Sequence, residues 1–221
     1  GLAGTIADWR ELCAAAAAAS GAPRAFFEDW FLPFKAADRG RDEGLFTGYY
    51  EPLLRGTRQA GGAFTVPLHG RPAGLVSVDL GRFAEDLKGR KLVGRVAGGN
   101  LVPLPDRREI VAGALHGEAP VIAWVDDPVD AFFLHVQGSG RVALADGGVL
   151  RVGYDGANGH GYTSIGRVLI ERGEIARAEV SLQSIRAWLA GHPDQAADLL
   201  AENRSYVFFR ELQGDGPIGA Q

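Results

Sequence analysis

Three stretches of the sequence place aromatic and hydrogen-bonding side chains beside glycines. They are FTGYYEP at residues 46–52, LHVQGSGRV at 134–142 and VGYDGANGHGYTSIG at 152–166. Sugar rings offer apolar C–H faces that stack on aromatic rings, and their hydroxyl groups need hydrogen-bond donors and acceptors. A packed core does not need this combination of side chains. The three stretches therefore predict a site that binds a carbohydrate.

Each candidate in these stretches has a binding interpretation and a structural one. His160, which lies between glycines, either binds a sugar group or hydrogen-bonds its own loop. Asn158 either binds substrate or forms a left-handed turn, whereas for Gln137 we favour substrate binding over turn stabilisation. The helix that opens at residues 162–164 can receive a carboxylate at its free N–H groups, unless Thr163 is a plain N-cap. The residues predicted to bind substrate are Tyr49, Tyr50, Glu51, Gln137, Ser139, Gly140, Tyr154, Asn158, His160, Tyr162 and Ser164.

The acidic residues near these stretches do not identify a catalytic acid. We interpret Glu51, before a proline, as an exposed carboxylate, and Asp155 as the start of an Asx-turn. Asp146 and the two glycines after it have the composition of a hairpin turn. A conventional two-carboxylate glycosidase would need Glu51 and Asp155 within about 10 Å of each other across a cleft. The catalytic residue therefore stays unassigned.

Composition excludes several classes of protein. The formal net charge of −4 and the dispersed Lys and Arg residues argue against a nucleic-acid partner. The single cysteine, Cys13, cannot form an internal disulfide or anchor a structural metal site, and we expect it to be a buried apolar residue on a helix. The run 13–19 is too short for a membrane span, and no export signal opens the sequence, so we expect any such signal to have been removed or never to have existed. No cofactor is implied.

Local patterns predict a mixture of helices and short strands. Asp8 and Glu11 resemble a capping box that opens the first helix, and the second carries an apolar aromatic stripe at 26–31 that we expect to be core. Tyr49 and Tyr50 share a predicted strand, so at most one of them lines the site. Helices are predicted at 9–19, from Pro23, and at 106–115, 163–171, 181–190 and 193–202. Strands are predicted at 45–50, 64–68, 75–78, 121–125, 131–138 and 206–210, with a hairpin over 141–154 and contiguous antiparallel pairing from 121 onward.

The order of these elements predicts an α+β fold that is mainly β. We find no internal repeat, and the 32 glycines and 11 prolines indicate many turns and argue against a helix bundle. Helices and a strand come first, a β-rich middle follows, and more helices precede a last strand. This order is typical of an inserted middle with a last strand that returns to the first domain.

The three stretches, in this order and followed by SYVFFRE, resemble the membrane-bound lytic murein transglycosylase A family. The resemblance runs from Phe46 to Ile218, and YDGANGHGYTSIGRVLIERGE is its most specific part. It implies part of a double-psi β-barrel formed by residues 1–54 with 204–221, and a small inserted glycan-binding β domain with helices at 55–203. It also implies a groove between these domains that holds peptidoglycan glycan strands.

The resemblance also implies a reaction. The family cleaves the bond between N-acetylmuramic acid and N-acetylglucosamine and forms a 1,6-anhydro sugar, which needs one acid because a substrate hydroxyl replaces water. In this family the acid belongs to a later Asp-x-Gly-Gly segment, which the 221 residues lack, so a missing C-terminal segment is an expected partner. The expected location is the periplasm, with outer-membrane anchoring before processing. The alternative is a murein-binding module that does not cut.

Overall fold

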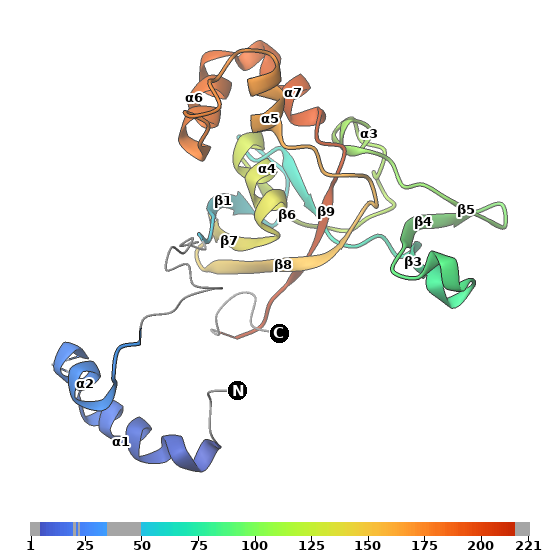
Figure 1. Ribbon diagram of the computed structural model, residues 1–221. Coiled ribbons are helices and arrows are strands. Elements are labelled where there is room, and N and C mark those ends of the chain that lie inside the picture. The colour runs from blue at the N-terminus through green and yellow to red at the C-terminus, as the bar shows by residue number, and fades with distance from the viewer. Residues whose placement is uncertain (1–4, 20, 22, 35–49, 215–221) are drawn as a thin grey trace. The chain divides into compact units, whose positions relative to one another are not determined.

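The computed structural model describes residues 5–19, 21, 23–34 and 50–214 (Figure 1). The chain divides into two compact units, Gly1–Tyr49 and Tyr50–Gln221, which are described separately. The strand predicted at 45–50 falls almost entirely on residues that are not described, and so does the candidate Tyr49.

The first unit contains helices whose apolar side chains are exposed. The 3-10 helix η1 (Ile6–Trp9) leads into α1 (Arg10–Ala18), and α2 (Pro23–Trp30) follows. The capping box lies one turn earlier than predicted. Thr5 is the N-cap, and the Asp8 carboxylate accepts the Thr5 N–H at 2.7 Å, so Asp8 lies inside the first turn. The expectation of buried side chains is wrong: Cys13 is exposed and α2 buries none of its described residues. The aromatic rings of α2 contact mainly one another, with Phe26 and Phe27 5.4 Å apart.

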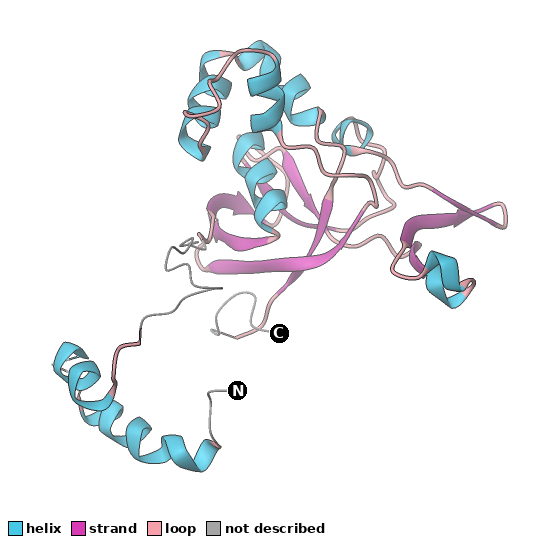
Figure 2. Ribbon diagram, in the orientation of Figure 1, coloured by secondary structure: helices cyan, strands magenta, loops and turns pink. Residues whose placement is uncertain are grey.

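A six-stranded sheet forms the centre of the second unit (Figure 2). Its order is β2-β6-β1-β7-β8-β9, and the β1–β7 pair is parallel whereas the other pairs are antiparallel. The predicted contiguous pairing from residue 121 onward is wrong, because β1 lies between β6 and β7. The predicted hairpin is confirmed: β7 pairs with β8, and Gly147 and Gly148 turn between them with φ of 98° and 85°. The strands are β1 (Leu53–Thr57), β2 (Val66–His69), β6 (Val121–Val125), β7 (Ser139–Leu144), β8 (Val149–Ala157) and β9 (Val207–Glu211).

The segment between β6 and β7 is helix α4 (Pro128–Gln137), not the predicted strand. Asp127 caps this helix, since its Oδ1 accepts the N–H groups of Val129 and Asp130 at 2.7 and 3.2 Å. Pro128 suits the first helical position. Residues 131–135 are all buried, so this run is enclosed on every side and lacks the 3.6-residue periodicity of a half-exposed helix.

Helix α4 separates two hydrophobic clusters. Ala131 and Leu134 pack in the cluster formed by the large sheet, whereas Phe132 and Phe133 pack with the helices that follow β8. In Figure 1 the helices α5, α6 and α7 gather on the side of α4 away from the sheet. All three were predicted, and their bounds are α5 (Ile165–Glu171), α6 (Leu182–Gly191) and α7 (Pro193–Ala201).

A second, three-stranded sheet projects from the same unit (Figure 1). Its order is β3-β4-β5, and Leu75 and Val93 join it to a third cluster with Tyr206 and Phe208. The predicted capped helix near residue 106 is confirmed but shorter, and Gly113 follows it with φ of 101°. These elements are β3 (Leu75–Asp79), η2 (Leu80–Arg82), η3 (Glu85–Leu87), β4 (Lys91–Ala97), β5 (Asn100–Val102) and α3 (Arg107–Val111).

The two edge strands of the large sheet approach each other at one point. Gly70, directly after β2, forms a parallel bridge with Phe209 of β9. A single bridge is not the continuous ladder that closes a barrel. In the part of the chain that the structure describes, the fold is therefore α+β, with one six-stranded and one three-stranded sheet.

Candidate functional site

Two of the three stretches meet where β7 begins. The first residue of β1, Leu53, pairs in parallel with Arg141 of β7, and the Arg141 N–H donates to Pro52 O at 2.8 Å. The start of the third stretch joins them, because Ser139 pairs with Gly153 of β8. We define the β7-start surface by the residues that these contacts bring together: Tyr50, Glu51, Gln137, Ser139, Arg141 and Tyr154.

Two glycines build the corner behind this surface. Gly138 ends α4 in the left-handed conformation, with φ of 77°, and turns the chain into β7. Gly140 is buried, and a Cβ atom there would lie 2.8 Å from Pro52 O and 2.6 Å from Leu134 Cδ1. Gly140 therefore permits the close approach of the first two stretches and offers no side chain to a ligand.

The β7-start surface presents the groups that a sugar polymer needs. Tyr154 is 56% exposed, Tyr50 is 45% exposed, and Gln137 at the end of α4 is also exposed. The Glu51 carboxylate accepts from Arg141 Nε at 2.8 Å in a partly exposed ion pair. Aromatic rings, an amide and paired charges can stack on and hydrogen-bond to sugars. Glu51 is held by a guanidinium and is not an isolated buried acid.

Tyr50 lies near a residue that the sequence patterns did not single out. Arg186 of α6 interacts electrostatically with Tyr50, and its Nη1 forms an ion pair of 2.6 Å with Asp130 Oδ1 at the start of α4. The same guanidinium lies 4.8 Å from the centre of the Phe133 ring. Arg141 was also missed, although a cation directly after Gly140 is visible in the sequence. The contacts of Arg186 have no sequence signal because they depend on how α4 and α6 pack.

The rest of the third stretch holds a loop together farther along β8. Asn158 is buried, and its Nδ2 donates to Pro105 O at 2.9 Å and Arg204 O at 3.0 Å. Its Oδ1 accepts the Tyr206 N–H at 2.9 Å. His160 Nε2 lies 2.7 Å from Leu104 O. The structure thus shows internal bonds for both residues.

The residues after His160 lie at the start of α5. Tyr162 is 60% exposed, while Ser164 is the N-cap and its Oγ accepts the Arg167 N–H at 3.4 Å. The Thr163 N–H donates to Asn203 Oδ1 at 3.1 Å. Asn158 is four positions after Tyr154, which is roughly 13 Å along an extended strand at about 3.3 Å per residue. The third stretch is therefore divided between the β7-start surface and a loop beyond it.

A buried polar network lies inside the unit. The Tyr206 hydroxyl is 2.8 Å from His69 Nδ1, and the Val207 N–H donates to His135 Nδ1 at 3.2 Å. Arg107 Nε donates to Asn203 O at 2.9 Å, and burial lowers the pKa of this guanidinium to about 10. His135 lies on α4, and its buried bond to the backbone gives it a structural role. The sequence patterns did not single out the other members of the network.

Among the described residues, no group of three or more His, Cys, Asp or Glu side chains could hold a metal ion. In the same part of the chain, no helix has both the length and the apolar character that crossing a membrane requires.

The sequence and the α+β fold of this chain are similar to those of known proteins. A family model described as "MltA specific insert domain" matches residues 45–210, and the chain belongs to this family. The membrane-bound lytic murein transglycosylase A of Escherichia coli strain K12 is 36% identical over 167 residues, which cover 75% of this chain and 38% of that protein. The protein of the same name from Vibrio cholerae is 35% identical over 168 residues, which cover 75% of this chain and 39% of that protein. The chain thus spans about two fifths of the length of these curated relatives.

Solved structures agree with this assignment. MltA from Neisseria gonorrhoeae superposes with a TM-score of 0.75 at 33% identity, covering 96% of this chain and 61% of that one. The lytic transglycosylase LtgG of Burkholderia pseudomallei superposes with a TM-score of 0.70 at 41% identity, and the match covers 99% of this chain and 60% of that one. E. coli MltA with bound chitohexaose superposes with a TM-score of 0.60 at 33% identity, and the match covers 79% of this chain and 44% of that one.

Proposed function

We propose that this chain is part of a lytic transglycosylase that cleaves peptidoglycan, and that the β7-start surface binds the glycan strand. The observation that carries the proposal is that the three stretches meet at the start of β7, where Tyr50 and Tyr154 are exposed and Glu51 pairs with Arg141. The names of the relatives support murein as the substrate, and the chitohexaose bound by the E. coli protein supports a polymer of N-acetylated sugars.

The proposed reaction breaks the bond between N-acetylmuramic acid and N-acetylglucosamine. A single acid protonates the leaving oxygen and then removes the proton of a hydroxyl on the muramic sugar, which forms the 1,6-anhydro ring. Such an acid must start out protonated, and burial is the usual means. Glu51, in its ion pair with Arg141, does not fit this role. In this proposal the acid comes from a segment of a longer protein outside these 221 residues.

The domain division is part of the same proposal. Residues 1–54 with 204–221 would contribute to a double-psi β-barrel, and residues 55–203 would form the inserted glycan-binding domain with its helices. In this division the six-stranded sheet is shared, since β9 comes from the outer segments, β1 crosses the boundary after residue 54, and the other strands come from the insertion. The single bridge between Gly70 and Phe209 leaves the edges of β2 and β9 largely open for further strands.

The site residues divide by role. Tyr50, Glu51, Gln137, Ser139 and Tyr154 contact the glycan in this proposal. The remaining candidates act through position: Gly140 permits the corner, whereas Asn158 and His160 hold the loop that leads to Tyr162 and Ser164. The proposed location is the periplasm, where murein lies, with an outer-membrane anchor before processing; the relatives' names describe them as membrane-bound.

The second candidate function is a module that holds murein without cutting it. The ion-paired state of Glu51 favours it for the 221 residues taken alone. The two functions differ in one observable, the release of anhydro-muropeptides from purified sacculi, which mass spectrometry detects. Binding without release assigns the chain alone to the second function, while release shows that these residues contain an acid.

Substitution of Tyr154 tests the binding surface. Loss of a stacking ring costs about 1 kcal/mol, so Tyr154→Ala is expected to weaken chitohexaose binding roughly fivefold. Isothermal titration calorimetry or sacculus pull-down measures the change. Val149→Ala is the control, because Val149 is 57% exposed on the same strand but lies outside the surface. Equal losses for both variants, or no binding by the unaltered chain, would contradict the proposal.

A further inference from the structure

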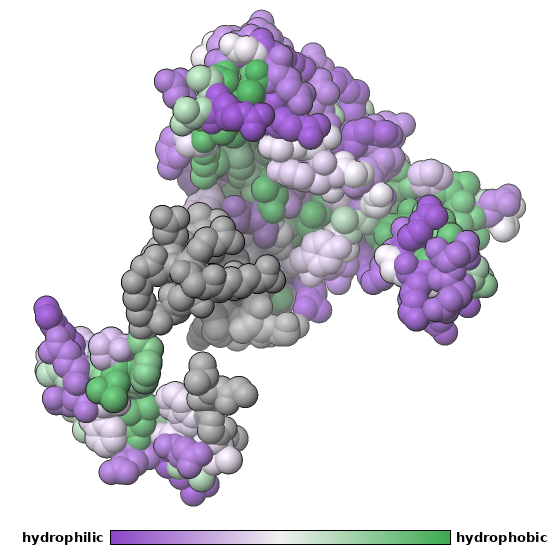
Figure 3. All heavy atoms as spheres, in the orientation of Figure 1, coloured by the Kyte–Doolittle hydropathy of each residue, from purple (hydrophilic) through white to green (hydrophobic). Residues whose placement is uncertain are grey.

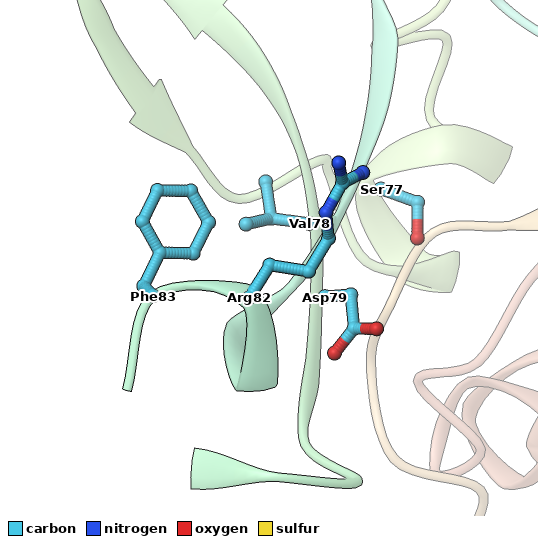
Figure 4. Close-up of a pocket in the computed structure, with 5 residues that line it drawn as sticks. All are labelled: Ser77, Val78, Asp79, Arg82 and Phe83. Atoms are coloured by element: carbon cyan, nitrogen blue, oxygen red, sulfur yellow. The ribbon is translucent and has the colours of Figure 1, made fainter. Parts of the chain in front are cut away.

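The turn after β3 exposes an aromatic ring that the proposed glycan surface does not use. Phe83 is 77% exposed, and it lines an open pocket of about 400 Å³ with Ser77, Val78, Asp79 and Arg82 (Figure 4). In Figure 4 the Val78 side chain points toward the Phe83 ring, and the Arg82 guanidinium lies on the Ser77 side. A slot between two apolar groups thus has a cation at one end.

Backbone contacts fix this arrangement. Asp79 ends β3 and caps η2, since its Oδ1 accepts the Gly81 N–H at 3.1 Å. A Cβ atom at Gly81 would lie 2.9 Å from Lys88 Cα, so glycine allows the turn to pack closely against the returning chain. The Phe83 N–H then donates to Leu80 O at 3.0 Å. The pocket is therefore built by a defined turn.

The pocket lies at one end of an apolar strip on the three-stranded sheet. Val78 is opposite Leu92, and Val96 is opposite Leu101, so these side chains share one face. Leu92 is 50% exposed and Val96 is 63% exposed. Figure 3 shows apolar residues over β4 and β5 beside the hydrophilic turn that contains η2 and η3. The surface around the pocket is thus suited to small apolar groups.

The charges around the pocket favour an anion. Lys88 forms an ion pair of 3.1 Å with Glu85, whereas no carboxylate in the described part of the chain pairs with Arg82. The Asp79 carboxylate points away from the guanidinium in Figure 4, and one of its oxygens is occupied by the turn. A guanidinium with free donors binds carboxylates in a bidentate manner.

We propose that this pocket binds a carboxylate whose α-carbon carries a methyl group. Arg82 takes the carboxylate, and the methyl group enters the slot between Val78 and Phe83. The inference rests on the proposed function, because murein offers this group twice. It ends the D-alanyl part of stem peptides, and it is the lactyl ether of muramic acid wherever the peptide has been removed.

Two probes identify the source of the group. Peptide backbone signals from residues 77–83 are followed by NMR during titration with D-alanyl-D-alanine and, separately, with N-acetylmuramic acid. Shifts with the dipeptide assign the pocket to stem peptides, and shifts with the sugar assign it to the lactyl group. D-alanyl-D-alanine amide and N-acetylglucosamine, which lack the carboxylate, are expected to leave these signals unchanged. The proposal is overturned if neither carboxylate shifts them.

Variants separate the pocket from the glycan surface. Arg82→Gln removes a charge-assisted hydrogen bond and is expected to weaken binding of the active probe roughly tenfold. Phe83→Ala is expected to weaken it too, whereas Arg90→Gln, an exposed cation on the same turn segment, is expected to have no effect. Chitohexaose binding stays unchanged in Arg82→Gln, so loss of probe binding and failure of the glycan proposal are distinguishable. If Arg90→Gln weakened binding of the active probe as much as Arg82→Gln does, the attraction would be nonspecific and the proposal would be overturned.

Discussion

Tyr206 joins two histidines in the interior of the second unit. Its hydroxyl is 2.8 Å from His69 Nδ1, and its ring centre is 4.2 Å from that of His135. Burial lowers the pKa of His69 to about 4 and holds the pKa of His135 well below its ordinary value. Burial also raises the pKa of the Tyr206 hydroxyl. All three groups are therefore neutral at neutral pH. When the pH falls, the histidines are the groups of this cluster that take up protons.

Stability should fall as the solution is acidified, because these histidines accept protons more readily in the unfolded chain. The pKa of His69 drops from 6.5 to about 4 on folding, so its contribution is complete above pH 6.5 and is lost as the pH falls toward 4. For His69 alone the loss is on the order of 3 kcal/mol. Urea denaturation measured between about pH 7 and about pH 4 covers this range.

The His69→Asn variant keeps an acceptor that can face Tyr206 but has no titrating group. It is expected to show a shallower dependence of unfolding free energy on pH, with the remaining slope due to His135 and, at lower pH, to carboxyl groups with lowered pKa values such as those of Asp106 and Glu211. An identical slope in the variant and the unaltered chain would contradict the assignment of this pH dependence to His69.

Residue types alone could predict that the third stretch is rich in hydrogen bonds, but not where each bond goes. Asn158 and Tyr154 lie four positions apart in the same glycine-rich sequence, yet Asn158 is buried and Tyr154 is exposed. The partners of Asn158 are carbonyls of Pro105 and Arg204, which the fold brings from distant parts of the chain. A side chain that binds a loop and one that binds a sugar need the same chemistry, so sequence left both interpretations open for Asn158.

At the scale of elements, capped or half-exposed segments were predictable and the fully buried helix was not. Helix α6 begins after Ser181, whose Oγ accepts the Ser184 N–H at 3.1 Å, and it was placed correctly. Helix α4 was read as a strand, because its run of Phe, Leu and Val has no polar face. The helix signal lay just before this run, in Asp127 followed by Pro128. The strand order depends on this helix, since it carries the chain from β6 past β1 to β7.

Removal of the α4 cap tests this explanation. Asp127→Ala leaves the N–H groups of Val129 and Asp130 without their acceptor and is expected to lower the unfolding free energy by about 1 kcal/mol. Denaturation in urea measures the change. Asp194→Ala is the matched control: Asp194 lies in the first turn of α7, whose cap has no side-chain hydrogen bond, and only a few tenths of a kcal/mol are expected. Equal effects would contradict a specific role of Asp127.

At the scale of the whole molecule, α4 couples the sheet to the helical layer. The buried residues of α4 are divided between the two clusters. Ala131 and Leu134 face the sheet, and Phe132 and Phe133 face the other helices. Residues 50–221 also form one compact unit by their internal contacts. Neither layer can lose α4 without exposing its own core. We therefore expect the large sheet and helices α5–α7 to unfold in one cooperative transition.

Substitution of Phe132 tests this coupling, because its ring is only 2% exposed and belongs to the helical cluster, not to the cluster of the large sheet. Phe132→Leu leaves a small cavity and is expected to cost about 1–2 kcal/mol. If the layers are coupled, hydrogen exchange measured by mass spectrometry should accelerate by the same factor in β6–β8 as in α5–α7. Val111→Ala, at a position that is 74% exposed on α3, should change neither. Faster exchange confined to α5–α7 would mean that the helical layer opens by itself, and α4 would then divide the molecule instead of joining it.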